Sequence, residues 1–180
     1  VKKDERINME TRYYSIPNVQ NIMYIESGLE FKFTPYCNIV VDKNYEDKLM
    51  EKAKTFAEDL RLLSGYGIKV TSGTRTGKGN ILLSLDFSRN DLGEEGYVIE
   101  VRKDYIEICG QTEKGVFWGT RTLLQWLNQG YRIQELSVVD RPVYRERSSM
   151  VDVARKYFTV EYIKNHIREL SYLKYNYLYL

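Results

Sequence analysis

Two stretches of the chain repeat apolar residues with the 3.6-residue period of an amphipathic helix. The first covers about residues 45–64, with Asn44 as its expected N-cap and Gly65 closing it, and the second covers about residues 112–130 after a capping Thr112. The residues expected to face the core are Leu49, Ala53, Phe56, Ala57, Leu60 and Leu63 in the first helix, and Val116, Phe117, Thr120, Leu123, Leu124 and Leu127 in the second.

Short runs rich in β-branched residues predict strands around these helices. The segment GYVIEVRKDYIEICG has the alternation of a hairpin that turns at Lys103–Asp104. Gly115 and Gly119 lower the helix propensity of the second helix but allow it to approach a sheet closely. Three further strands are expected at residues 37–42, 67–73 and 79–86.

The pattern changes in the last third of the chain. Residues 131–147 are interpreted as an extended connector, and RSSMVDVA then predicts a strand. A helix capped by Thr159 follows, and NYLYL predicts another strand. A strand–helix–strand unit requires a parallel sheet, and two parallel strands cannot form a domain because both of their faces need cover. The chain is therefore expected to end inside a second domain, with an inward helix stripe of Val160, Ile163, Ile167, Leu170 and Leu173.

This order of elements predicts an α+β protein. Residues 1–14 are charged and aperiodic and are expected to be a flexible lead-in. Residues 15–138 are expected to form a two-layer domain of one sheet and two helices, and residues 139–180 the truncated start of the second domain.

Composition excludes several functions. The 27 basic and 25 acidic residues are interleaved, which does not favour nucleic acid binding. No apolar run approaches the roughly 18 residues of a membrane span. No signal peptide is present, but the chain starts at Val1, so a leader could have been removed. The compartment stays open, with a secreted or cell-surface location somewhat favoured over the cytoplasm, and Cys37 and Cys109 are either free thiols or bridged.

Candidate chemistry is sparse before residue 140. TSGTRTGKGN has three residues between Gly73 and Gly77, where a phosphate-binding loop needs four, so a hairpin loop is expected there. His166 is the only histidine and has no partner at ligand spacing, so no metal site is predicted, and a catalytic triad is disfavoured.

Charged residues surround the apolar run in RERSSMVDVARKYF. Active sites form at the carboxyl ends of the parallel strands of a barrel. If this run is the first strand of a barrel, Asp152 and Arg155 lie on the side of the active site. Arg147 comes earlier in the strand and needs a paired environment if it is buried. The spacing alone also fits a structural Asp152–Arg155 pair that braces the loop after the strand.

These residues resemble the opening of the catalytic domain of family 20 glycoside hydrolases, the β-N-acetylhexosaminidases, which follows the pattern D-x-P-R-F-x-x-R-G-x-x-x-D-x-x-R-x-[FY]-[FY]. Ser148 departs from it, because the family usually has glycine there. Residues 95–127 resemble the accessory domain that precedes this domain in the family. The matching positions are Asp140, Pro142, Arg147, Asp152, Arg155, Tyr157, Phe158, Lys174, Asn176 and Leu178.

The resemblance implies a zincin-like accessory domain, the first βαβ unit of a TIM (β/α)8 barrel, and a glycan substrate with a terminal N-acetylhexosamine. It assigns Arg147 to the sugar hydroxyls at C3 and C4, with Asp152 and Arg155 supporting the site. The chemistry is substrate-assisted and needs no cofactor. Its Asp-Glu pair belongs to a later strand outside this chain, so the chain alone is expected to be inactive and to need the remainder of its barrel.

Two alternatives remain open at this point. The two-layer domain could be a non-catalytic carbohydrate- or protein-binding module with the last residues as a docking appendage. The chain could also come from another hydrolase family whose barrel follows a similar domain, such as the O-GlcNAcase or α-glucuronidase types. The spacing of Asp152 and Arg155 argues against that second alternative.

Overall fold

The computed structural model describes residues 13–74 and 77–180. Its helices are η1 (Lys43–Tyr45, a 3-10 turn), α1 (Glu46–Ser64), α2 (Glu113–Gln129) and α3 (Val160–Tyr172). Its strands are β1 (Asn21–Tyr24), β2 (Glu30–Lys32), β3 (Asn38–Asp42), β4 (Lys69–Gly73), β5 (Asn80–Leu85), β6 (Tyr97–Arg102), β7 (Tyr105–Gly110), β8 (Arg132–Gln134), β9 (Leu136–Asp140), β10 (Ser148–Met150) and β11 (Tyr177–Tyr179).

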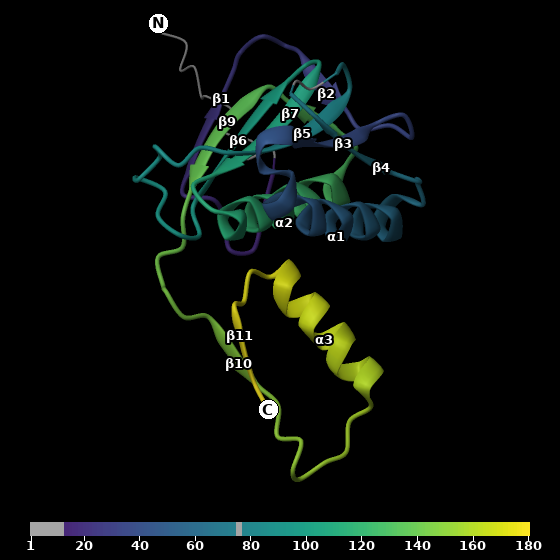
Figure 1. Cartoon of the computed structure of the whole chain (residues 1–180), viewed down its shortest axis with the longest axis vertical. Helices are drawn as coiled ribbons and strands as arrows, with labels where there is room; N and C mark the ends of the chain where they lie inside the picture. Colours follow the sequence, from purple (N-terminus) through teal and green to yellow (C-terminus); the bar gives the residue numbers. More distant parts are fainter. Residues whose placement is uncertain (1–12, 75–76) are drawn as a thin grey trace, which may run out of the picture.

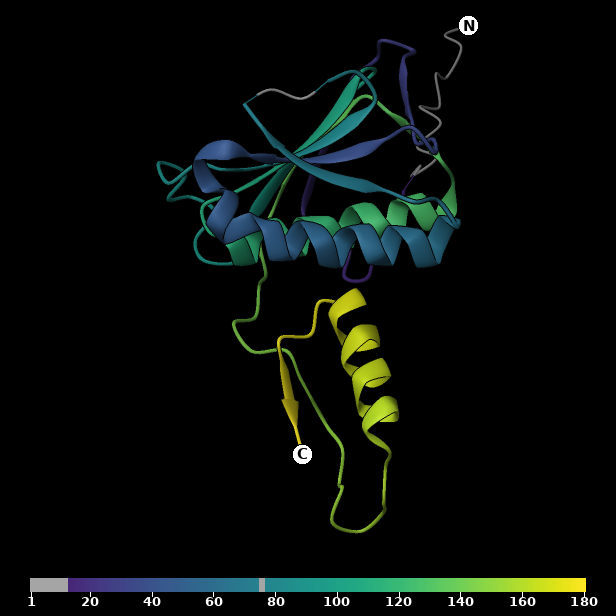
Figure 2. The same cartoon turned by 45° about the vertical axis from the view of Figure 1, so that its right-hand side comes forward.

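Seven strands form one mixed sheet in the order β1-β9-β6-β7-β5-β3-β4. The neighbours from β1 to β7 pair antiparallel and those from β7 to β4 pair parallel. Helices α1 and α2 lie side by side against one face of this sheet (Figures 1 and 2). We call the sheet with α1, α2 and the small β2–β8 pair the sheet domain. The expected combination of one sheet and two covering helices is confirmed.

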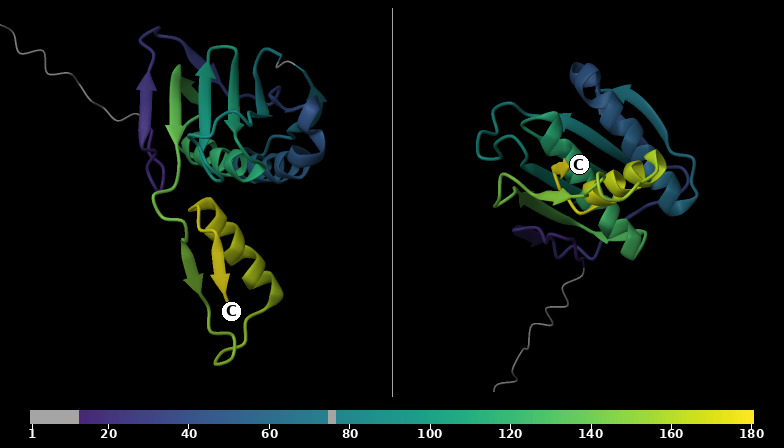
Figure 3. Two further views of the ribbon diagram at one scale, coloured as in Figure 1. Left: turned by 60° about the vertical axis from the view of Figure 1, so that its left-hand side comes forward. Right: turned by 90° about the horizontal axis from the view of Figure 1, so that it is seen from below.

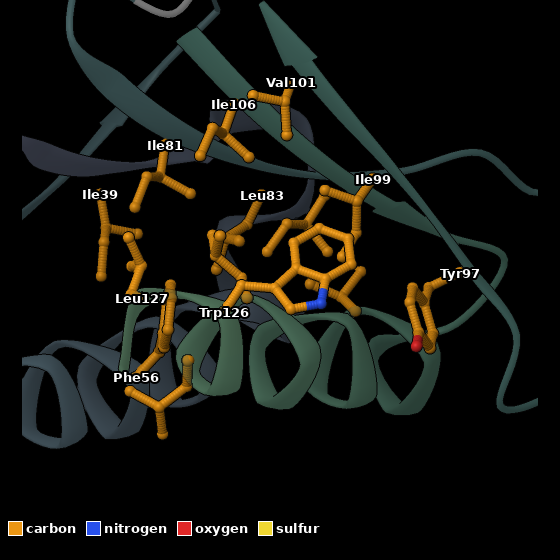
Figure 4. Packing of buried hydrophobic residues seen from close by; sticks show 14 of the residues in the cluster. Ile39, Phe56, Ile81, Leu83, Tyr97, Ile99, Val101, Ile106, Trp126 and Leu127 are labelled. Carbon is orange, nitrogen blue, oxygen red and sulfur yellow. The ribbon is translucent and has the colours of Figure 1, made fainter. Parts of the chain in front are cut away.

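The core of the sheet domain lies between the sheet and the helix pair (Figure 4). Alternate residues of β6 and β7 point towards α2, as the alternation in their sequence predicts. Trp126 of α2 is fully buried among them, although the sequence analysis did not assign it to the core. The residues at the centre are Ile39, Ile81, Leu83, Ile99, Val101, Ile106, Ile108 and Leu127.

The helix ends agree with the sequence except at one residue. The Thr112 hydroxyl accepts a hydrogen bond from the Lys114 amide at 3.1 Å, and Gly65 closes α1 with a φ of 75°. The prediction of Asn44 as N-cap is wrong, because Asn44 lies inside η1. The side chain that caps this turn is Asp42, and α1 begins after Tyr45 without a side-chain cap.

The interpretation of residues 131–147 as a connector is also wrong. They contain β8 and β9, and β9 pairs with β1 on one side and β6 on the other. Leu136, Val138 and Asp140 face inward on this strand. The expected domain boundary after residue 138 therefore falls inside β9, which continues to Asp140.

Two further expectations need correction at the edges of the sheet domain. Residues 1–12 of the expected lead-in lie outside the described residues, but Tyr13 packs against Trp126, with ring centroids 5.8 Å apart. Strands β4 and β5 do not form a hairpin, because each pairs in parallel with β3 on opposite sides. Residues 75–76 of the loop between them are outside the described residues.

The last part of the chain forms a separate lobe below the helix layer, on the side that faces away from the sheet (Figures 1 and 3). We call residues 144–180 the C-terminal lobe. β10 and β11 pair in parallel, with Ser148 opposite Tyr177, as the strand–helix–strand pattern predicts. The Thr159 hydroxyl caps α3. The strand predicted as RSSMVDVA ends at Met150, and no residue of α3 is buried, so the expected inward stripe of α3 is absent from this structure.

Candidate functional site

The charged residues singled out in the sequence lie at opposite ends of β10. Arg147 directly precedes the strand, whereas Asp152 and Arg155 follow it. Because β10 and β11 are parallel, their amino-terminal ends lie together near α2 and their carboxyl ends point away from the sheet domain (Figure 3). Arg147 therefore belongs to the junction between the sheet domain and the lobe, and Arg155 to the far end of the lobe.

Each side-chain nitrogen of Arg147 donates a hydrogen bond to a protein oxygen. Nε bonds to the Lys174 carbonyl at 2.7 Å, and Nη1 bonds to the Tyr144 carbonyl at 2.8 Å. Nη2 forms an ion pair with Glu95 Oε2 at 2.8 Å. The guanidinium also lies over the ring of Trp118 in α2, 5.5 Å from its centroid. The paired environment expected for Arg147 is therefore present.

Asp152 and Arg155 form the pair expected from their spacing. Asp152 Oδ1 accepts hydrogen bonds from the backbone N–H groups of Ala154 and Arg155, at 3.1 and 3.0 Å. Its Oδ2 lies 3.2 Å from Arg155 Nε. The Arg155 side chain is 89% exposed, so the ion pair itself adds little stability, and the backbone contacts are what hold this turn. The guanidinium remains open to solvent at the carboxyl end of β10.

Glu95 was not identified from the sequence, yet its carboxylate contacts both strands of the lobe. Oε2 accepts from Arg147, before β10, and Oε1 accepts from Asn176 Nδ2 at 3.0 Å, before β11. Asn176 in turn accepts from the Arg147 backbone N–H through its own Oδ1 at 2.8 Å. One carboxylate of the sheet domain thus joins the beginnings of two strands that are distant in sequence.

A second polar cluster surrounds Lys174. Its Nζ donates to the Tyr97 hydroxyl at 2.7 Å and lies 3.4 Å from Asp140 Oδ2. Tyr97 donates to the same carboxylate oxygen, and its hydroxyl also contacts Thr122 Oγ1 at 2.6 Å. Burial lowers the pKa of Lys174, against the opposing effect of Asp140, and burial together with the Asp140 charge raises the pKa of Tyr97.

Three cavities adjoin these clusters at the junction. Their volumes are about 530, 250 and 800 Å³. The first and third are lined by Glu95 and Asn176, and the second by Arg147 and Lys174. All three are at the opposite end of the strand pair from Asp152 and Arg155.

Other chemistry is limited within the described residues. Residues 13–74 and 77–180 contain no cluster of three or more His, Cys, Asp or Glu side chains that could hold a metal ion. Cys37 and Cys109 are both free thiols. Across the same described ranges, no helix is long and apolar enough to cross a membrane.

Comparison with known families accounts for nearly the whole described chain. Residues 13–141 match the model of "Glycosyl hydrolase family 20, domain 2", and residues 144–180 match "Glycosyl hydrolase family 20, catalytic domain". The chain belongs to glycosyl hydrolase family 20. Residues 144–180 match only part of the family's catalytic domain.

Relatives within family 20 have similar sequences over the same region. The chain is 32% identical over 136 residues to the lacto-N-biosidase of Bifidobacterium bifidum, covering 74% of this chain and 12% of that protein. It is 29% identical over 140 residues to the β-hexosaminidase of Porphyromonas gingivalis, covering 72% of this chain and 18% of that protein. The chain therefore spans less than a fifth of the length of these two relatives.

Solved structures of the family have the same fold. The β-N-acetylhexosaminidase of Streptomyces coelicolor superposes with a TM-score of 0.77 at 27% identity, covering 91% of this chain and 33% of that chain. A mutant β-hexosaminidase of Streptomyces plicatus, solved in complex with its product GlcNAc, has the same score, identity and coverage. The match includes the C-terminal lobe, because it extends over nine-tenths of this chain.

Proposed function

We propose that this chain is the N-terminal portion of a β-N-acetylhexosaminidase that removes terminal N-acetylglucosamine or N-acetylgalactosamine from glycans. The observation that carries this proposal is the succession of two family 20 matches along one chain, the second of which coincides with a parallel strand–helix–strand unit. The structure of a relative holding GlcNAc supports the class of substrate.

In this proposal the chain divides into an accessory domain and the start of a (β/α)8 barrel. The accessory domain is zincin-like and extends from about residue 13 to the end of β9 at Asp140, two residues beyond the boundary expected from the sequence. β10, α3 and β11 are the first βαβ unit of the barrel, and the remainder of the barrel supplies the cover that α3 lacks.

Hydrolysis would be substrate-assisted and would retain the anomeric configuration. The 2-acetamido oxygen of the sugar attacks its own anomeric carbon, and a carboxylic acid protonates the leaving oxygen. The resemblance places this acid in an Asp-Glu pair on a later barrel strand. The described residues of this chain contribute binding groups to that site and no acid.

The contacts of the two arginines bear on which of them meets the sugar. The role of Arg147 as the sugar ligand stays a prediction, and its geometry argues against it, because all three of its nitrogens already bind protein oxygens. Arg155 has an exposed guanidinium at the carboxyl end of β10, the end at which barrel active sites lie. We therefore assign the two parallel hydrogen bonds to adjacent sugar hydroxyls to Arg155, and Asp152 fixes the turn that carries it.

The activity of the isolated chain is the first test. We expect the purified 180-residue chain to release no 4-nitrophenol from 4-nitrophenyl N-acetyl-β-glucosaminide, because the resemblance places the acid for the leaving group on a later barrel strand. The longer protein that continues through the remaining barrel strands should release it under the same conditions. Release by the 180-residue chain above a blank preparation would contradict the assignment of the acid to a later strand, and inactivity of the longer protein would contradict the proposed function.

A further inference from the structure

The C-terminal lobe lacks a hydrophobic core of its own. Among residues 144–180, all of which the structure describes, Lys174 is the only buried residue. Two parallel strands and one helix cannot bury enough apolar surface to be stable alone, because the gain from burial must exceed the entropy lost on ordering the chain. Within the 180 residues of this chain, the contacts that can order the lobe are therefore those that it makes with the sheet domain.

Lys174 extends from the lobe into the sheet domain. Its ammonium group is held by Tyr97 of β6 and Asp140 of β9, and only 6% of its side chain is exposed. Its backbone has a φ of 60°, a left-handed conformation that non-glycine residues rarely adopt. Such a conformation persists where surrounding contacts determine it. The Lys174 backbone is held by the Ser171 carbonyl and by Arg147 within the lobe, and its side chain is held by Tyr97 and Asp140 of the sheet domain.

Glu95 extends in the opposite direction, from the sheet domain to the lobe. Its carboxylate binds Arg147 and Asn176, which precede β10 and β11, and the side chains of Glu95 and Arg147 are 15% and 16% exposed. A third contact lies at the end of α3, where the Gln125 side-chain amide of α2 donates to the Tyr172 carbonyl at 2.6 Å. All three elements of the lobe are thus attached to the sheet domain near one end.

We infer that the sheet domain is an intramolecular docking template for the C-terminal lobe, with Glu95 and Lys174 as the two reciprocal anchors. Through Glu95 it sets the spacing between the beginnings of β10 and β11, and through Lys174 it holds the turn between α3 and β11. The partner that this surface fits is a strand pair that presents a guanidinium, an amide and an ammonium at its amino-terminal edge. This inference is independent of hydrolase activity and can be tested on the 180-residue chain.

The test is hydrogen–deuterium exchange of the intact chain, followed by mass spectrometry of its peptides. Two backbone hydrogen bonds report on the lobe, Asn176 N–H to the Arg147 carbonyl and Val151 N–H to the Tyr179 carbonyl, both 2.9 Å long. The amides of β6 and β7 report separately on the sheet domain. Protection at these two sets of amides can therefore change independently.

Glu95→Gln is the decisive substitution, and Glu94→Gln is its matched control. Glu94 is the neighbouring residue, is exposed, and pairs with Lys114 inside the sheet domain. We expect E95Q to accelerate hydrogen exchange in the lobe by about ten-fold or more, since Arg147 loses the negative charge of its largely buried partner. Exchange in β6 and β7 should stay unchanged. E94Q should leave both regions as in the parent chain.

Lys174→Met tests the second anchor from the lobe side, with the exposed Lys164→Met on α3 as its control. K174M keeps most of the length of the side chain and removes its charge, and we expect it to increase hydrogen exchange in the lobe while K164M does not. K174M also decides the matter if E95Q destabilises the sheet domain. The inference would be overturned if K174M leaves hydrogen exchange in the lobe unchanged and E95Q also leaves it unchanged while β6 and β7 stay protected.

Discussion

An arginine lies almost completely buried between α1 and α2 in the sheet domain. Arg121 Nη1 forms an ion pair with Asp59 Oδ2 at 2.5 Å, and the guanidinium lies over the ring of Phe117, 4.7 Å from its centroid. Burial lowers the pKa of Arg121, and Asp59 opposes that change. Because an unpaired charge in this position would be costly, the Asp59 carboxylate is what makes burial of the guanidinium tolerable.

Replacing Asp59 alone should therefore be strongly destabilising. We expect Asp59→Ala to lower the free energy of unfolding by about 3–5 kcal/mol, because it leaves the Arg121 charge buried without a partner. Urea unfolding measures this directly. The control is Glu58→Ala at the preceding position, where an exposed pair with Arg61 is lost and the midpoint should barely move. Equal effects of the two substitutions would contradict this account of the buried pair.

The Cys109 thiol offers a prediction on pH dependence. Burial raises its pKa, and the nearby Glu107 and Asp86 carboxylates act in the same direction. A pKa that is higher in the folded state means that the thiol stabilises the fold below its unfolded value of about 8.5, and that this contribution is lost as pH rises through the folded pKa. In a Cys37→Ser variant, alkylation by iodoacetamide should reach its half-maximal rate at a higher pH than for free cysteine. A half-maximal rate at a lower pH than for free cysteine would contradict the raised pKa of Cys109.

At the scale of elements, α2 approaches the sheet at two glycines. A Cβ atom on Gly115 would lie 2.1 Å from the Gly96 carbonyl oxygen, and one on Gly119 would lie 2.5 Å from Ile108 Cγ2. The first obstacle is backbone and cannot rotate away, whereas the second is the end of a side chain. This confirms the close approach predicted from the spacing of Gly115 and Gly119.

Gly115→Ala should consequently destabilise the protein despite the higher helix propensity of alanine. We expect the free energy of unfolding to fall by about 1–3 kcal/mol, because the clash with backbone outweighs the propensity gain of roughly 1 kcal/mol that alanine brings to an open helix position. Gly67→Ala is the matched control, because no atom lies within 4 Å of the added Cβ. Thermal unfolding of both variants measures the difference. A G115A protein as stable as G67A would contradict the packing described for α2.

The elements show what the sequence could and could not predict. Periodicity predicted α1, α2 and the β6–β7 hairpin, because each buries one face and its apolar residues therefore recur with the period of a helix or a strand. β9 was missed because it is only five residues long and lies in the stretch 131–147, which was interpreted as an extended connector. The inward stripe expected on α3 is not buried in this structure, because a stripe is buried only where a partner covers it.

At the scale of the whole molecule, the family and the order of its two parts could be inferred from motifs in residues 95–127 and 140–178. The contacts between the two parts could not. Glu95 and Asn176 are 81 positions apart, and Tyr97 and Lys174 are 77 apart, so no local pattern links them. The sequence already placed Arg147 before β10 and Arg155 after it, but it did not show that the beginning of β10 lies against the sheet domain, where Arg147 pairs with Glu95.

The most direct test of this account is the rate of 4-nitrophenol release from 4-nitrophenyl N-acetyl-β-glucosaminide by the longer family 20 protein, before and after Arg155→Met. We expect the unmodified protein to hydrolyse the substrate. R155M should lower kcat/KM by about 100-fold or more, the effect of losing two charge-assisted hydrogen bonds, without changing the unfolding midpoint. An R155M protein that keeps the unmodified kcat/KM would contradict the assignment of the sugar contact to the carboxyl end of β10.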